Sequence, residues 1–212
     1  MARIRKIKRD PGTNLRNYYL LDACFIANKH IALKYAPDEE QRVRLKACQD
    51  WWYEIEKQLE ADRARVYIPD ICIAESFKVL AKKFYEEKWY KKWSDFDKAR
   101  KDLMNDIHVP IAELIKGRRR IKFHDVSTCR DLIISVDRFF ELFMKRKKKV
   151  QIADLILVAT AKYLMDFYDI PKRLLHIVTL DEDLWAGAKK VYELPGVYNP
   201  AQKNDCAEKV FE

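Results

Sequence analysis

Short, nearly continuous apolar runs alternate along the chain with longer segments in which apolar residues recur every three or four positions. Such runs are typical of strands buried on both faces of a sheet, and such segments are typical of helices. The pattern predicts strands at residues 18–21, 65–68, 121–123, 174–179 and 196–198. Strands that alternate with helices indicate an α/β fold, in which helices cover both faces of a parallel sheet.

The expected helices begin and end at residues that commonly cap or break helices. Asp38 is followed by Glu39 and Glu40, so a helix begins there with acids favourably placed in its first turn. A strongly apolar helix covers residues 152–168 and ends before Pro171. Further helices are predicted at residues 25–35, 71–87, 95–116, 128–145 and in the segment before residue 191. Helices therefore separate all the predicted strands.

The chain of 212 residues has a length that one α/β domain can fill, and its apolar content of 49% is ample for a core. We place this domain at residues 18–200, with a highly charged helical insertion at about residues 81–120. A basic N-terminal arm is expected at residues 1–17 and a C-terminal tail at residues 201–212.

The chain is basic, with 42 Lys and Arg against 33 Asp and Glu and a formal net charge of +9. This excess favours a polyanionic partner, nucleic acid before an anionic membrane, although many soluble proteins are also basic. Five scattered cysteines without a Cys-x-x-Cys pair indicate reduced thiols in a cytoplasmic protein, not a disulfide framework or a zinc site. The apolar runs are too short and too charged for a signal peptide or a membrane span.

Four acids occupy positions where the local pattern favours an apolar residue or a helix cap. Asp22 ends the first strand, and Asp181 follows the strand near residue 179. Asp154 lies in the first turn of the apolar helix, and Glu75 interrupts an apolar run. Each alone has an ordinary explanation as a cap, a strand-end acid or a solvated side chain. Because ligands of parallel α/β sheets lie at the carboxyl ends of strands, we expect the four to meet there.

Carboxylates gathered in one cleft repel one another, which raises their pKa values unless a cation relieves the repulsion. Oxygen-only ligands select hard cations such as Mg²⁺ or Mn²⁺ over zinc. Such a site can activate water, orient a phosphodiester for in-line attack and stabilise the leaving oxygen. The acids therefore indicate metal-dependent hydrolysis of phosphodiesters.

Five blocks of the sequence resemble, in order and setting, the motifs of PIN domains. They are Tyr19-Leu20-Leu21-Asp22-Ala23, Ile73-Ala74-Glu75, residues 152–161, residues 178–184 and the ending Gly196-Val197-Tyr198-Asn199-Pro200. The resemblance covers most of residues 18–200 and includes the VapC-like ribonucleases. It implies a PIN-like, Rossmann-like central parallel sheet flanked by helices. It also implies a nuclease that depends on Mg²⁺ or Mn²⁺, often a single-strand endoribonuclease.

By motif position, the resemblance assigns catalysis and metal binding to Asp22, Glu75, Asp154 and Asp181. It makes Asp183 an auxiliary acid, and it makes Thr179 the residue that orients the fourth carboxylate or the water on the metal. Two features depart from the family. Cys24 stands where the family usually has Ser, Thr or Asn, and the chain is longer than the toxin-type members, mainly within residues 81–120.

Two kinds of segment are candidates for contacting RNA. In the insertion, bases alternate with aromatic residues, and we select Trp89, Tyr90 and Trp93 as candidates to stack on nucleotides. The basic runs Arg118-Arg119-Arg120 and Arg146-Lys147-Lys148 are candidates to bind phosphates. The alternatives are an amphipathic helix that packs its aromatics inside, and solvated or helix-terminal charge for the basic runs.

Other kinds of catalytic site find little support in the sequence. The four histidines lack paired spacing, which disfavours metal-free cleavage through the 2′-hydroxyl, and His176 is expected in the core. The four glycines form neither a phosphate-binding loop nor a dinucleotide fingerprint, and no Gly-x-Ser-x-Gly elbow occurs.

The sequence thus predicts a cytoplasmic, metal-dependent endoribonuclease that cleaves single-stranded RNA and leaves 5′-phosphate and 3′-hydroxyl ends. Its expected partners are RNA, an antitoxin protein if it is the toxin of a toxin–antitoxin pair, and a second copy of the chain; no membrane is expected. The alternatives are a stand-alone RNA-processing nuclease, a DNA-directed nuclease, and a non-catalytic nucleic-acid-binding module of the same fold. Cys24 is the main argument for the last of these.

Overall fold

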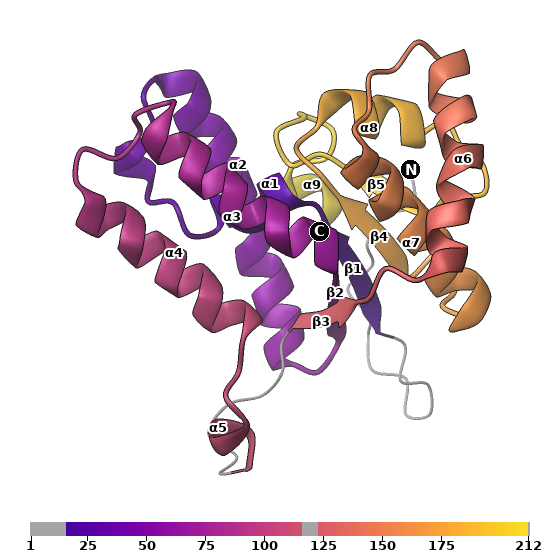
Figure 1. Cartoon of the computed structure of the whole chain (residues 1–212), viewed down its shortest axis with the longest axis horizontal. Helices are drawn as coiled ribbons and strands as arrows, with labels where there is room; N and C mark the ends of the chain where they lie inside the picture. The colour runs from indigo at the N-terminus through magenta and orange to yellow at the C-terminus, as the bar shows by residue number, and fades with distance from the viewer. Residues whose placement is uncertain (1–15, 116–122, 212) are drawn as a thin grey trace.

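The computed structural model describes residues 16–115 and 123–211. Its centre is a five-stranded sheet with the strand order β3-β2-β1-β4-β5 (Figure 1). All neighbouring strands are parallel, so their carboxyl ends lie at one edge of the sheet. The strands are β1 Asn17–Leu21, β2 Ala64–Pro69, β3 Phe123–Val126, β4 Leu175–Val178 and β5 Gly196–Tyr198.

Helices connect consecutive strands, as the alternating pattern predicts. Between β1 and β2 lie α1 Ala23–Asn28, the short 3-10 helix η1 Leu33–Tyr35 and α2 Glu39–Glu60. Between β2 and β3 lie α3 Asp70–Tyr85, α4 Trp93–Ile107 and α5 Ile111–Ile115. The rest are α6 Arg130–Lys145 and α7 Ile152–Phe167 before β4, α8 Glu182–Ala188 before β5, and α9 Ala207–Val210 after it.

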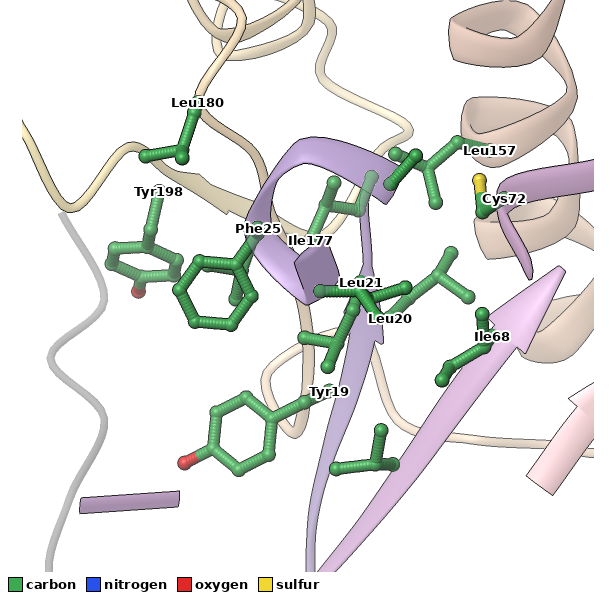
Figure 2. Packing of buried hydrophobic residues seen from close by; sticks show 14 of the residues in the cluster. Tyr19, Leu20, Leu21, Phe25, Ile68, Cys72, Leu157, Ile177, Leu180 and Tyr198 are labelled. Atoms are coloured by element: carbon green, nitrogen blue, oxygen red, sulfur yellow. The ribbon is translucent and has the colours of Figure 1, made fainter. Parts of the chain in front are cut away.

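Helices cover both faces of the sheet, and β1 is buried between them. The Tyr19 hydroxyl donates a hydrogen bond to Gln58 Oε1 of α2 at 2.9 Å. Leu20 points to the opposite face because side chains alternate along a strand. That face is covered by α7, which contacts β1, β2 and β4. Figure 2 shows the buried side chains that surround β1, including Tyr19, Leu20 and Phe25.

The described part of the predicted insertion consists of the last turn of α3, of α4, α5 and their loops. In Figure 1, α4 lies at one end of the molecule and α6 at the other. α4 packs against α3, and the Phe84 and Phe96 rings stack there with their centroids 4.8 Å apart. Amphipathic packing therefore accounts for these aromatic residues of the segment.

The predicted fold class, an α/β fold with a parallel sheet, is confirmed, but several element boundaries are wrong. The helix expected at residues 25–35 ends at Asn28, and η1 forms separately. The helix expected at residues 95–116 is interrupted before α5, where Pro110 lacks the backbone N–H that a continuous helix needs.

The end of the chain that was expected as a tail contributes to the core. Val210 and Phe211 are buried, and the Phe211 ring packs edge-on against Trp51 of α2, with centroids 4.8 Å apart. None of the helices in the described part of the chain has both the length and the apolar character that crossing a membrane requires.

Candidate active site

Asp22 lies at the centre of the candidate site, immediately after β1 and at the start of α1. Its side chain is 5% exposed, and its carboxylate accepts a hydrogen bond from Thr179 Oγ1 at 3.0 Å. The pKa of Asp22 is raised to about 6, mainly by burial and also by the negative charge of Asp181. The Thr179 hydroxyl and the backbone N–H groups of Ala23 and Leu180 oppose this shift. Asp22 is therefore a buried acid whose hydrogen bonds only partly offset its loss of hydration.

Asp181 is held beside Asp22 because β1 and β4 are neighbours and both end at this edge. Asp181 caps α8, where its carboxylate accepts a hydrogen bond from Leu184 N at 2.6 Å. Thr179 joins the two acids, because its hydroxyl donates to Asp22 and accepts from Asp181 N at 2.9 Å. The structure thus places Thr179 where it orients both Asp22 and the turn that carries Asp181.

Asp154 approaches the same place from the first turn of α7. One of its carboxylate oxygens accepts a hydrogen bond from Gln151 N at 2.8 Å. The pKa of Asp154 is raised to about 7, mainly by burial and also by the charges of Asp22, Asp181 and Glu75. The three acids from β1, α7 and the β4–α8 turn therefore repel one another.

Glu75 completes the set from the second turn of α3. Its side chain is half-buried and has no hydrogen bond or ion pair within residues 16–115 and 123–211. Its charge acts on Asp154 and also raises the pKa of the buried Cys72 thiol. Asp154 therefore lies within electrostatic reach of the other three acids, and the shared site expected of the four stays a prediction.

The fit of a divalent cation depends on these carboxylates. Within the described residues, no group of three or more His, Cys, Asp or Glu side chains is arranged so that it could hold a metal ion. Asp154 and Asp181 each commit one oxygen to a helix terminus, so a cation must use their second oxygen or compete with the cap. The donor chemistry nevertheless fits a hard cation, because the donors are oxygens whose mutual repulsion a cation would relieve.

Cys24 lies two residues beyond Asp22, and its surroundings contain charges of both signs. Burial raises the pKa of the Cys24 thiol, and Asp22 and Asp154 raise it further. Lys83 of α3 and Arg44 of α2 oppose this shift. Two basic residues that the sequence did not single out therefore lie near Cys24, on which Asp22 and Asp154 also act. Neither has a local signal, because each comes near the site only through helix packing.

Asp183 lies in the first turn of α8 and contacts the loop between α6 and α7. Its carboxylate forms an ion pair with Lys148 Nζ at 2.8 Å and accepts a hydrogen bond from Lys149 N at 3.3 Å. These contacts lower the pKa of Asp183 and direct it to the α6–α7 loop. The acid is thus paired with Lys148, and its role as an auxiliary acid of the site stays a prediction.

Contacts within the chain also use part of the basic run at residues 146–148. Arg146 donates hydrogen bonds to the carbonyls of Gly187 at 2.7 Å and Lys190 at 3.1 Å, at the end of α8. With Lys148 paired to Asp183, two of the three expected phosphate contacts instead attach the α6–α7 loop to α8. Lys147 is exposed, and Arg118, Arg119 and Arg120 lie outside the described residues.

The aromatic residues selected as RNA contacts divide into two groups. Trp89 is only 7% exposed, and Lys83 Nζ lies 3.3 Å from the centre of its ring. Tyr90 is also buried, with its ring 4.8 Å from that of Tyr35. The expectation that Trp89 and Tyr90 stack on nucleotides is wrong, because their faces are covered by protein. Trp93 is 55% exposed and stays a candidate.

No family model and no curated protein sequence matches the chain. Among solved structures, the chain is similar to VapBC2 from Rickettsia felis bound to a DNA fragment from their promoter. The TM-score is 0.50 at 11% identity, and the alignment covers 86% of this chain and 98% of that chain. It is also similar to FitAB bound to an IR36 DNA fragment, with a TM-score of 0.49, 18% identity and coverage of 87% and 96%. It is similar, too, to FitAcB from Neisseria gonorrhoeae, with a TM-score of 0.47 and 19% identity. That alignment covers 86% of this chain and 97% of that chain.

The likeness to VapBC2 is a likeness of fold. Together with the five parallel strands in the order β3-β2-β1-β4-β5, it shows that the chain has a VapC-like PIN-domain fold. The fold expected from the motif blocks is therefore confirmed. The acids of those blocks lie at the edge of the sheet where parallel α/β folds bind their ligands.

Proposed function

We propose that the chain is a divalent-metal-dependent endoribonuclease that hydrolyses single-stranded RNA. The observation that supports the proposal is that the charges of Asp22, Asp181 and Glu75 all act on Asp154 in a chain with a VapC-like PIN-domain fold. Their repulsion and burial cost stability in the folded state. A set of neighbouring acids with perturbed pKa values in one place is typical of a functional site.

The four acids are the residues that would hold Mg²⁺ or Mn²⁺. When bound there, the cation would neutralise their charge, activate water and stabilise charge on the phosphodiester. Thr179 fixes the Asp22 carboxylate through its hydroxyl at 3.0 Å and sets the direction of the Asp181 backbone. Leu20 and Leu21 of β1 and Ile177 of β4 are fully buried in the strands that precede Asp22 and Asp181. This chain thus supplies oriented oxygen donors on a rigid, apolar support.

The proposed substrate follows from charge and from the motif resemblance to VapC-like ribonucleases. The net charge of +9 favours a polyanion. Hydrolysis by an activated water would leave 5′-phosphate and 3′-hydroxyl ends. The proposal includes the role of a toxin that is inhibited by an antitoxin protein, in a cytoplasmic setting.

The test is cleavage of a mixed pool of single-stranded RNA and DNA, with Mg²⁺, Mn²⁺ or EDTA, by the wild type, Asp22→Asn and Asp154→Asn. We expect cleavage of RNA that needs the metal and both acids and that leaves 5′-phosphate ends. Asp166→Asn is the matched control, because Asp166 lies on α7 with Asp154 but is exposed and paired with Lys162. Cleavage that survives EDTA, or that survives both site substitutions, would overturn the proposal. Cleavage confined to DNA would replace the proposed substrate with DNA.

The second candidate is a nucleic-acid-binding module that does not cleave. It is favoured by Cys24 and by the acids of α7 and α8, which already serve as helix caps. Retained binding of RNA without cleavage under any metal condition would select this alternative.

An antitoxin protein and a second copy of the chain are proposed partners, and the insertion is the proposed contact surface. It exposes Tyr85, Trp93 and Met104 around α3 and α4. A rival surface lies on α6, where Ile134 and Phe140 are exposed. We expect Trp93→Ser with Met104→Ser to reduce self-association in light scattering, and Ile134→Ser with Phe140→Ser to leave it unchanged. The reverse result would move the contact surface to α6.

A further inference from the structure

Arg44 is a basic residue attached directly to the candidate active site. It lies near the start of α2, and its guanidinium donates a hydrogen bond to the carbonyl oxygen of Leu180. Leu180 lies between Thr179, which binds Asp22, and Asp181. Within the described residues, Arg44 forms no ion pair, and its other N–H groups make no hydrogen bond. The guanidinium is therefore fixed by one donor while its other donors are available to a ligand.

Lys83, in the last turn of α3, brings a second cation near Cys24, on which Arg44 also acts. Its side chain is only 11% exposed, because the ammonium group lies over the ring of Trp89 at 3.3 Å. Its one acidic neighbour among the described residues is Glu87, at 3.8 Å. Burial lowers the pKa of Lys83, and the positive charge of Arg44 lowers it further. The two cations are thus near enough to repel each other, and only Lys83 has a loose acidic partner.

An anion that binds between the two cations would relieve this repulsion. A nucleic acid strand that approaches the four acids must bring its own negative phosphates next to them. A cation held beside the acids offsets that repulsion and fixes the register of the strand. We propose that Arg44 and Lys83 together form a seat for a phosphate of the substrate strand, next to the carboxylates. This inference rests on the proposed function and deepens it by naming residues that position the substrate.

The chain offers matched controls for both residues. Lys46 lies on α2 two residues from Arg44 and pairs with Asp50. Lys78 lies on α3 five residues before Lys83 and is exposed. Because residues two or five apart point to different sides of a helix, Lys46→Gln and Lys78→Gln remove the same charge without touching the proposed seat.

The experiment measures binding of a fluorescein-labelled, mixed-sequence single-stranded RNA to the full chain in an Asp154→Asn background, with Mg²⁺ and a series of salt concentrations. We expect Arg44→Gln and Lys83→Gln each to weaken binding about tenfold. Each should also reduce the slope of log K against log salt concentration by about 0.7, because one phosphate contact is lost. Arg44→Lys should restore the slope but not the full affinity, because lysine lacks the planar fork of donors. The two controls should leave affinity and slope unchanged.

A structural role for Arg44 would lower the unfolding temperature but would not change the salt slope of the folded fraction. The proposed phosphate seat would be wrong if the salt slopes were unchanged in both Arg44→Gln and Lys83→Gln. It would also be wrong if the controls changed the slopes equally. Cleavage by the chain without the Asp154→Asn substitution separates this result from the proposed function. If that chain cleaves RNA and Arg44→Gln leaves KM unchanged, the seat is wrong and the nuclease stands. If it cleaves nothing but binding depends on Arg44 and Lys83, the seat stands and the nuclease is wrong.

Discussion

Two buried aspartates, Asp22 and Asp205, have opposite surroundings. Asp205 is 1% exposed, and its carboxylate accepts hydrogen bonds from Trp185 Nε1 at 2.7 Å and from Asn199 N at 3.2 Å. It also pairs with Lys189 Nζ at 3.4 Å. Asp22 has Thr179 as its side-chain donor, its carboxylate forms no ion pair among the described residues, and the charge of Asp181 raises its pKa.

This difference separates an acid that stabilises the fold from acids that do not. Asp205 joins α8 to the end of β5, and its backbone carbonyl also accepts a hydrogen bond from Trp51 of α2 at 2.7 Å. A buried charge with partners of this kind makes its region cohesive. The acids around Asp22 violate the same rule, since burial and repulsion both act against their charge. Such violations concentrate at functional sites, where the rest of the fold maintains them.

The largest effect is expected from Asp154→Asn, which removes one of the repelling charges. We expect cleavage to fall at least about 100-fold, as for other losses of transition-state electrostatics. In EDTA, the same variant should unfold at a higher temperature than the wild type, because the repulsion with Asp22, Asp181 and Glu75 is relieved. Differential scanning calorimetry and a cleavage assay give the two values. A variant that is both less stable and fully active would show that these acids are ordinary structural residues.

Asp205→Ala should lower stability and leave cleavage unchanged, the opposite of Asp154→Asn. It leaves Trp185 Nε1, Asn199 N and Lys189 without their acceptor, so we expect a loss of about 2–4 kcal/mol in the free energy of unfolding. Cleavage by the fraction that stays folded should be unchanged. Urea denaturation measures the loss. Asp50→Ala is the control, because that acid is half-exposed and pairs with Lys46 at the surface.

Added Mn²⁺ sharpens the contrast, because the acids around Asp22 repel one another whereas Asp205 is paired with Lys189. Saturation at about 100 times the dissociation constant would stabilise the wild type by about 2.7 kcal/mol. The unfolding temperature should therefore rise with Mn²⁺ in the wild type and in Asp205→Ala, but much less in Asp154→Asn. An equal rise in all three proteins would indicate metal binding elsewhere.

The local pattern of the sequence predicts the acids around Asp22 well. Asp22 and Asp181 each follow an apolar strand, and parallel strands end at the same edge, so their meeting follows from topology. Asp154 interrupts an apolar helix, and an interruption of that kind is visible without a structure.

The partners of the charged and aromatic residues around the acids are harder to predict. They depend on contacts between residues distant in the sequence, which a local pattern does not encode. Lys148 and Asp183 are 35 residues apart and pair only because the α6–α7 loop packs on α8. Trp89 belongs to a segment of alternating bases and aromatics that resembles an exposed platform, yet its ring lies under the ammonium group of Lys83. The order of charged and aromatic residues is the same whether such a segment binds RNA or packs on its own domain.

His176 provides a smaller, pH-dependent test away from the acids. It is buried in β4 as expected, between the rings of Tyr19 and Tyr198, and neither ring nitrogen has a hydrogen-bond partner among the described residues. Burial lowers the pKa of His176 to about 3, below its ordinary value of 6.5. The unfolded chain therefore binds a proton first as the pH falls, so stability is complete above pH 6.5 and is lost as the pH falls towards 3.

Between pH 6.5 and 4.5, the free energy of unfolding contributed by His176 falls by about 2–3 kcal/mol. His176→Phe should remove that part of the pH dependence of unfolding. His124→Phe should remove less, because His124 is only half-buried. Equal pH dependence in the wild type and His176→Phe would show that His176 is not the residue responsible.

Cys24→Ser is expected to have the smallest effect, and it tests how far the Asp22 region is adapted to cleavage. Cys24 is half-buried near Asp22 and Asp154, where a hydroxyl would be a better hydrogen-bond partner for a phosphate or for water than a thiol. We expect a two- to tenfold increase in kcat, about 0.4–1.4 kcal/mol, with little change in the unfolding temperature. Cys206→Ser, a half-buried thiol far from the acids along the chain, should change neither value. A loss of cleavage in Cys24→Ser alone would mean that the thiol itself contributes to cleavage. A hydroxyl at this position would then not replace it.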